Sequence, residues 1–66
     1  MQINFNGKQT EIAENISITD LIANYALDIN AIAIEHNLKI IAPEQYEQVK
    51  LQDGDSLEVV EFVGGG

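Results

Sequence analysis

The chain has 66 residues, of which 45% are hydrophobic, and 11 acidic residues against 3 basic ones give it a net charge of −8. A chain of this length forms one small domain, and its hydrophobic share is high enough for a folded core. The charge argues against nucleic-acid binding, which needs clustered lysine and arginine, and the lack of cysteine excludes disulfides, thiolate metal sites and cysteine catalysis.

The first segment predicts a β-hairpin. Ile3 and Phe5 alternate with polar residues, which is the period of a strand with one buried face. Asn6-Gly7 follows, and both residues tolerate the positive φ angles of a two-residue hairpin turn. We therefore expect a second strand over residues 8–12.

The segment “ISITDLIANYAL” predicts a helix. Ser17 can cap its N-terminus, and Asp20 lies in the first turn, where a negative charge interacts favourably with the helix dipole. Ile16 can pack against the first turn as a hydrophobic staple. One face of the helix is apolar and has to pack against a sheet. It consists of Ile18, Leu21, Ile22 and Tyr25.

Two short strands and a turn are expected next. Ile32 and Ile34 share one face of a strand, and Asn37 is a typical turn residue. Ile40 and Ile41 indicate a second, shorter strand, which the following proline ends. The next residues, “PEQYEQV”, are typical of a single helical or 3₁₀ turn.

The last strand follows a turn at “DGD”. In this strand Leu57 and Val59 should point to the helix, which leaves Glu58, Val60 and Phe62 on the other face. Single exposed apolar residues are ordinary, but an apolar pair beside the end of the chain favours a site for a partner protein. Glu58, Val60 and Phe62 are therefore the predicted partner-binding residues.

The order of the elements predicts the fold. One helix between strands in so short a chain has to cover one face of a single sheet. The first and last strands are both apolar and are best placed side by side and parallel at the centre. This is the β-grasp arrangement, an α+β fold with a mixed sheet of four to five strands. We expect the β-grasp domain over residues 1–63 and a flexible glycine tail over residues 64–66.

Other polar residues do not predict a catalytic or metal site. His36 lies in a turn-like “EHN” without a second histidine, so we expect its side chain to be exposed. Asp53 and Asp55 lack the remaining ligands of a calcium loop and are expected to shape the turn. The acidic surface has two interpretations: it steers the chain towards a basic partner, or it only keeps a small domain soluble.

Three glycines, Gly64, Gly65 and Gly66, end the chain. The hairpin, the capped helix, the “QDGDSLEVV” segment and the terminal Gly65-Gly66 together resemble the thiamine-biosynthesis sulfur carriers, the ThiS family, which are ubiquitin-like β-grasp proteins. The resemblance covers essentially the whole chain. It is weakest in “EHNLKIIAP”, where Ala42 precedes Pro43 and the family's Asn-Gly turn before a Val-Pro pair is less clear.

The resemblance implies a chemistry for the tail. An ATP-dependent adenylating (activating) enzyme converts the Gly66 carboxylate to an acyl-adenylate, and sulfur originating from cysteine then replaces AMP to give a thiocarboxylate. Thiazole synthase takes that sulfur to build the thiazole ring of thiamine. Glycine suits this role because a bare backbone can thread a narrow channel. On this interpretation the chain is a carrier and not an enzyme, it binds no cofactor itself, and ATP acts through the partner.

Two related functions stay open. The small subunit of molybdopterin synthase uses the same fold and the same thiocarboxylate, although that family usually has longer chains. A ubiquitin-like modifier would be joined through Gly66 to lysines of target proteins. A third alternative is a small binding module with a disordered end. The chain has no apolar stretch of membrane-spanning length and no signal-peptide pattern, so we expect a cytoplasmic protein, monomeric alone, with no membrane partner and no metal.

Overall fold

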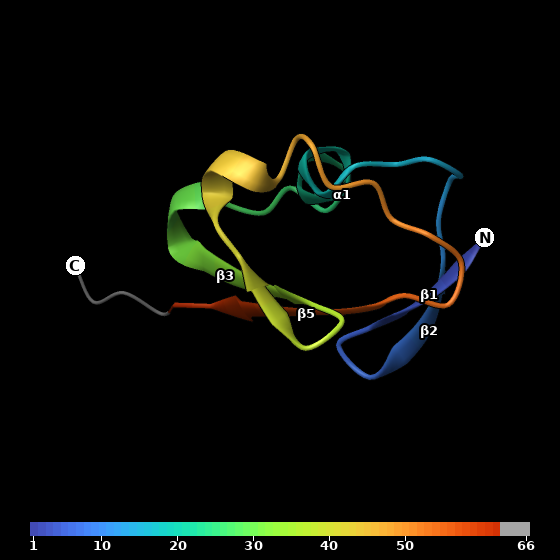
Figure 1. Ribbon diagram of the computed structural model, residues 1–66. Coiled ribbons are helices and arrows are strands. Elements are labelled where there is room, and N and C mark those ends of the chain that lie inside the picture. Colours follow the sequence, from blue (N-terminus) through green and yellow to red (C-terminus); the bar gives the residue numbers. More distant parts are fainter. Residues whose placement is uncertain (63–66) are drawn as a thin grey trace.

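A mixed β-sheet with one α-helix across one face makes up residues 1–62, the part of the chain that the computed structural model describes (Figure 1). The strands are β1 (Gln2–Phe5), β2 (Lys8–Glu11), β3 (Ile32–His36), β4 (Lys39–Ile41) and β5 (Ser56–Glu61). The helix is α1 (Ile18–Asn24), and Ile29–Ala31 and Pro43–Gln45 form 3₁₀ turns. The predicted α+β, β-grasp arrangement is confirmed, with five strands in the sheet.

The strand order is β2-β1-β5-β3-β4. Strands β1 and β5 are parallel neighbours, with Asn4 opposite Ser56 and Phe5 opposite Leu57, as predicted for the first and last strands. Strand β3 pairs with β5 in the antiparallel sense. The last strand therefore lies at the centre of the sheet. It ends at the side of the molecule opposite to the N-terminus (Figure 1).

Both hairpin turns depend on residues with positive φ. Asn6 and Gly7 have φ values of 51° and 80°, which confirms the predicted hairpin turn. The Asn6 side chain also accepts a hydrogen bond from the Val59 backbone N–H at 2.6 Å, so this turn is tied to β5. In the second hairpin Asn37 and Leu38 have φ values of 50° and 70°, and leucine is rarely found in this conformation.

Helix α1 begins with a capping box. The Ser17 side chain accepts from the Asp20 N–H at 3.1 Å, and the Ser17 N–H donates to the Asp20 carboxylate at 3.3 Å. The helix ends at Asn24, so Tyr25 is its C-cap and lies at the edge of the core, where its ring still packs on Phe5 of β1. Ala26, with φ of 53°, turns the chain away, and Tyr25 is 47% exposed with its ring 4.9 Å from that of Phe5.

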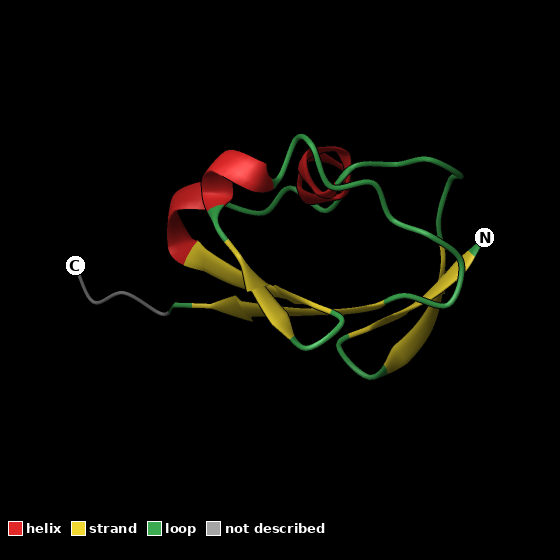
Figure 2. Cartoon of the chain, in the orientation of Figure 1, coloured by secondary structure: helices red, strands yellow, loops and turns green. Residues whose placement is uncertain are grey.

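The core lies between α1 and the sheet. Figure 2 shows that the helix and the 3₁₀ turns all cover the same face of the sheet. We call the opposite, uncovered face the open face. Tyr46, just after the second 3₁₀ turn, is one of the fully buried side chains, and burial raises the pKa of its hydroxyl. The other buried hydrophobic residues are Ile3, Ile12, Ile16, Ile18, Leu21, Ile22, Ile32, Ile34, Ile41, Leu51 and Leu57.

His36 is not an exposed turn residue, as the sequence had predicted, but the last residue of β3. Its side chain is only 17% exposed, and its Nε2 atom lies 2.8 Å from Asp55 Oδ2. The other carboxylate oxygen of Asp55 accepts from the Asn37 side chain at 3.2 Å, and Oδ2 also accepts from the Gln52 N–H at 2.9 Å. Asp55 thus joins the β3–β4 turn to the turn before β5, in agreement with the predicted turn-shaping role.

Candidate functional site

The end of β5 is held by backbone hydrogen bonds as far as Phe62. Glu61 lies opposite Ile32 in the ladder, and the Phe62 N–H donates to the Ala31 carbonyl at 2.7 Å. The 3₁₀ turn before β3 therefore anchors Phe62, which we call the root of the tail. The predicted tail residues lie outside the described part of the chain. They are Gly64, Gly65 and Gly66.

The two faces of β5 have the predicted orientations. Leu57 is fully buried under the helix and Val59 is partly buried. Glu58, Val60 and Phe62 alternate with them and are exposed, the two apolar side chains by 56% and 59%. The three predicted partner-binding residues are therefore accessible on the open face; that they bind a partner stays a prediction.

The β3–β4 hairpin extends this apolar surface. Ile40 is 76% exposed and Leu38 is 88% exposed. Together with Val60 they line a shallow hollow of about 290 Å³ on the open face. We call Leu38, Ile40, Val60 and Phe62 the open-face patch. Leu38 and Ile40 were not among the predicted partner-binding residues. Two-residue alternation in β4 separates exposed Ile40 from buried Ile41, but only the strand order brings Ile40 near β5.

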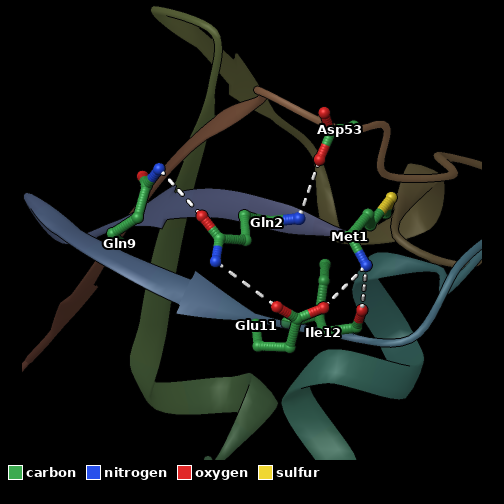
Figure 3. Close-up of polar contacts among 6 residues, drawn as sticks. All are labelled: Met1, Gln2, Gln9, Glu11, Ile12 and Asp53. Atoms are coloured by element: carbon green, nitrogen blue, oxygen red, sulfur yellow. Dashed lines mark hydrogen bonds and ion pairs between the residues drawn. The ribbon is translucent and has the colours of Figure 1, made fainter.

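The other half of the open face is polar (Figure 3). The N-terminal ammonium donates to Glu11 Oε2 at 3.0 Å and to the Ile12 carbonyl at 2.9 Å. The Gln2 side chain donates to Glu11 at 3.4 Å and accepts from Gln9 at 3.1 Å. The hydrogen bond to Glu11 is the main cause that raises the pKa of the ammonium, and the same contact lowers the pKa of the Glu11 carboxyl. On this half of the face Gln2, Gln9, Glu11 and the N-terminal ammonium thus bond to one another.

A second hollow adjoins the same strand end from the helix side. Its volume is about 600 Å³, and its apolar lining comes from Phe5, Tyr25, Leu27 and Val59. Lys8 and Glu61 also line it. Strand β5 thus lines a hollow on each face of the sheet, through Val59 and Glu61 on the helix side and through Glu58 and Val60 on the open face.

Residues 1–62 contain neither a metal-binding cluster nor a membrane-spanning helix. In this range no group of three or more histidine, aspartate or glutamate side chains is arranged to hold a metal ion. None of the helices in the described part of the chain has the length and apolarity needed to cross a bilayer.

Known proteins resemble this chain over its whole length. A family model described as “ThiS family” matches residues 3–66. “Sulfur carrier protein ThiS” of Bacillus subtilis (strain 168) is 40% identical over 65 residues, which cover 97% of this chain and 98% of that protein. The crystal structure of the thiamine biosynthesis protein ThiS from Geobacter metallireducens superposes with a TM-score of 0.87 at 28% identity, with 100% of both chains covered.

A longer protein also matches. “Thiazole synthase” of Paramagnetospirillum magneticum is 35% identical over 66 residues, which are 100% of this chain but 20% of that protein. The chain therefore spans about a fifth of the length of this relative. The family match over residues 3–66, the full-length relative and the structural match agree with one another. The chain belongs to the ThiS family.

Proposed function

We propose that this chain carries sulfur as a thiocarboxylate on the C-terminal carboxyl of Gly66 and delivers it for thiazole formation. Its family is that of the sulfur carriers of thiamine biosynthesis. The observation that carries the proposal is the similarity to the Bacillus subtilis sulfur carrier, which extends over nearly all of both chains. This similarity favours the thiamine pathway over a molybdopterin synthase subunit or a protein modifier.

The chemistry needs activation, because a carboxylate is a poor electrophile. A Gly66 carboxylate oxygen attacks the α-phosphorus of ATP, and pyrophosphate leaves to give an acyl-adenylate. Hydrosulfide released from cysteine then attacks the carbonyl carbon, and AMP and a proton leave to give the thiocarboxylate. An adenylating partner enzyme catalyses these steps, so the chain is a cosubstrate without an active site of its own. Because the reaction consumes ATP and cysteine-derived sulfur, we expect it in the cytoplasm.

An exposed apolar surface beside Phe62, the last described residue before the tail, supports this role. The last described backbone hydrogen bond is that of Phe62, whose side chain belongs to the open-face patch. From there four residues can span at most about 14 Å. A partner that docks on the patch can therefore reach Gly66 only if its active site lies within that distance. We infer that Glu58, Val60 and Phe62 contact the partner while Gly64 and Gly65 lead Gly66 into its active site.

Two partners follow from this proposal. The first is the adenylating enzyme, and the second is thiazole synthase. The similarity between this chain and a fifth of a protein named thiazole synthase supports the second, because it suggests that carrier and synthase act together. Sulfur transfer then returns the tail to a carboxylate, which can be activated again.

The proposal is tested by loading the protein in vitro. The chain is incubated with its adenylating enzyme, ATP and a cysteine-derived sulfur donor, and its intact mass is measured after treatment with a thiol-reactive alkylating agent. Alkylation is needed because oxidation of Met1 adds nearly the same mass as the exchange of oxygen for sulfur. We expect one alkylated group per chain, at Gly66 and only with ATP. Conjugates to lysines of other proteins, or no ATP-dependent product, would contradict the proposal.

A further inference from the structure

We propose that the open-face patch docks a surface of the adenylating enzyme that presents apolar side chains around one arginine, and that Glu35 and Glu58 together bind its guanidinium. This inference rests on the proposed function, because that function supplies the partner. It adds a residue that the sequence analysis did not single out, Glu35, and it gives Glu58 a specific ligand.

The register of the sheet brings the two carboxylates together. Glu35 in β3 lies directly opposite Glu58 in β5. Ile34 on the same strand is buried towards the helix, so alternation places Glu35 on the open face beside Glu58. Both glutamates line the hollow of about 290 Å³ that Ile40 and Val60 also line. Directly opposite residues have Cβ atoms about 5 Å apart, so the two carboxylates share one small space.

No lysine of the chain compensates this pair. Lys39 lies opposite His36, and Lys8 lies opposite Phe5, so both share the helix-covered face of the sheet. Lys50 is outside the five strands and bridges to Ser17. Of the chain's 3 basic residues, none is therefore on the open face. The two ion pairs among residues 1–62, Met1–Glu11 and His36–Asp55, also leave both glutamates out.

Like charges directly opposite each other in a sheet are destabilising. In this chain the pair also has apolar neighbours on the open face, because Ile40 lies directly opposite Glu35 and Val60 follows Glu58 on the same face of β5. The arrangement is unfavourable for the free protein and becomes favourable when a cation lies between the carboxylates. A guanidinium fits best, because its planar fork of five N–H donors can bind two carboxylates at once.

The negative charge of the open face decides which kind of molecule can bind the open-face patch. A second copy of this chain would bring the same two carboxylates against themselves, in a protein whose net charge is −8. An anionic membrane surface would be repelled for the same reason. A partner protein with apolar side chains around an arginine complements both the apolar rim and the acidic centre. The occupant we propose is therefore the adenylating enzyme that loads the tail.

The test compares binding and stability in three variants. Glu35→Gln and Glu58→Gln each remove one carboxylate, and Glu47→Gln is the control, because it removes the same charge from an exposed residue outside the strands. Dissociation constants for the adenylating enzyme are measured by calorimetry, and Tm is measured on the free proteins. We expect Glu35→Gln and Glu58→Gln to weaken binding about tenfold or more, the loss typical of a charge-assisted hydrogen bond. Their Tm should stay equal or rise.

The outcomes separate this inference from the proposed function. If wild-type protein loads sulfur, and both glutamine variants bind as tightly as Glu47→Gln, the arginine site is wrong and the carrier function stands. A lower Tm in Glu35→Gln or Glu58→Gln would show that the carboxylates serve the fold, which also overturns the inference. If wild-type protein neither binds the adenylating enzyme nor loads sulfur, both proposals fail.

Discussion

Phe62, the root of the tail, has a large apolar side chain that is 59% exposed to solvent. Leu57, five residues earlier on the same segment, is fully buried against the helix. The two residues therefore separate docking from folding. Truncating an apolar side chain that anchors an interface lowers the binding affinity, whereas truncating one that fills the core lowers the free energy of unfolding.

We expect Phe62→Ala to weaken docking to the adenylating enzyme and to thiazole synthase by about 2 kcal/mol or more, as for a buried interface anchor. The free energy of unfolding should change by no more than about 0.5 kcal/mol, because the side chain is on the open face. Leu57→Ala should instead cost about 2–5 kcal/mol of stability. Chemical denaturation and calorimetric binding measure the two effects. If Phe62→Ala unfolds the protein while Leu57→Ala does not, the faces of β5 are assigned the wrong way round.

Asp55 couples the fold to pH. Burial acts to raise the pKa of its carboxyl, but hydrogen bonds from His36, the Gln52 N–H and Asn37, with the charge of His36, outweigh burial and lower the pKa. A carboxyl with a lowered pKa stabilises the folded state above its unfolded-state pKa of about 3.9. That contribution is lost as the pH falls through the lower pKa of the folded state.

We therefore expect Asp55→Asn to destabilise the protein by about 1.5 kcal/mol or more at neutral pH, where it loses charge-assisted hydrogen bonds. Between about pH 5 and pH 2 the stability of the wild type should fall more steeply than that of the variant. Thermal unfolding across this range measures both effects. Glu44→Gln, an exposed carboxylate, is the control and should follow the wild type. Parallel pH profiles for Asp55→Asn and wild type would contradict this role.

At the scale of the elements, the sequence predicted those features of turns, caps and strands that depend only on residues close together in the chain. The Asn6-Gly7 turn, the Ser17 cap and the alternation of β5 were all read correctly, because each involves residues within a few positions. The missed features depend on contacts between distant segments. Tyr46 enters the core from a 3₁₀ turn, and His36 meets Asp55 from 19 residues away.

The exposed residues of the open face also divide into those that local pattern predicted and those that it did not. Val60 and Phe62 were predicted from the alternation of one strand. Ile40 and Glu35 join them only through the register of β3 with β4 and β5. The pairing register between these strands cannot be predicted from the sequence of any one strand. The apolar period extends the predicted helix through Tyr25, whereas the positive φ of Ala26 ends the helix at Asn24 and leaves Tyr25 half-exposed against Phe5.

The capping box of α1 offers a test at this scale. Ser17→Ala removes the hydrogen bond to the Asp20 N–H and should cost about 1 kcal/mol of stability. Ser17→Thr keeps a capping hydroxyl and should retain most of the stability. Because the helix covers the face of the sheet away from the open-face patch, neither change should alter the affinity for the adenylating enzyme. Denaturation and binding are measured together, and an Ala variant as stable as wild type would contradict the role of the cap.

At the scale of the whole molecule, the fold separates three tasks. The helix-covered face of the sheet holds the core, and polar groups on the other half of the open face bond to one another. The apolar half of the open face lies beside the root of the tail, and it is there that we propose a partner docks. This division accounts for a small chain whose stability and whose proposed chemistry depend on different residues.

The central claim is that sulfur is carried at Gly66, at a fixed distance from the docking surface. The most direct measurement compares the rate of ATP-dependent sulfur loading in wild type, in a chain without Gly65 and Gly66, and in a chain with one residue added after Gly66. One residue shifts the end by about 3.3 Å or more, and a misplacement of 1 Å can cost about a hundredfold in rate. The account predicts that both altered chains keep the wild-type Tm and lose loading. Loading of either altered chain as fast as wild type, measured as the alkylated mass, would contradict it.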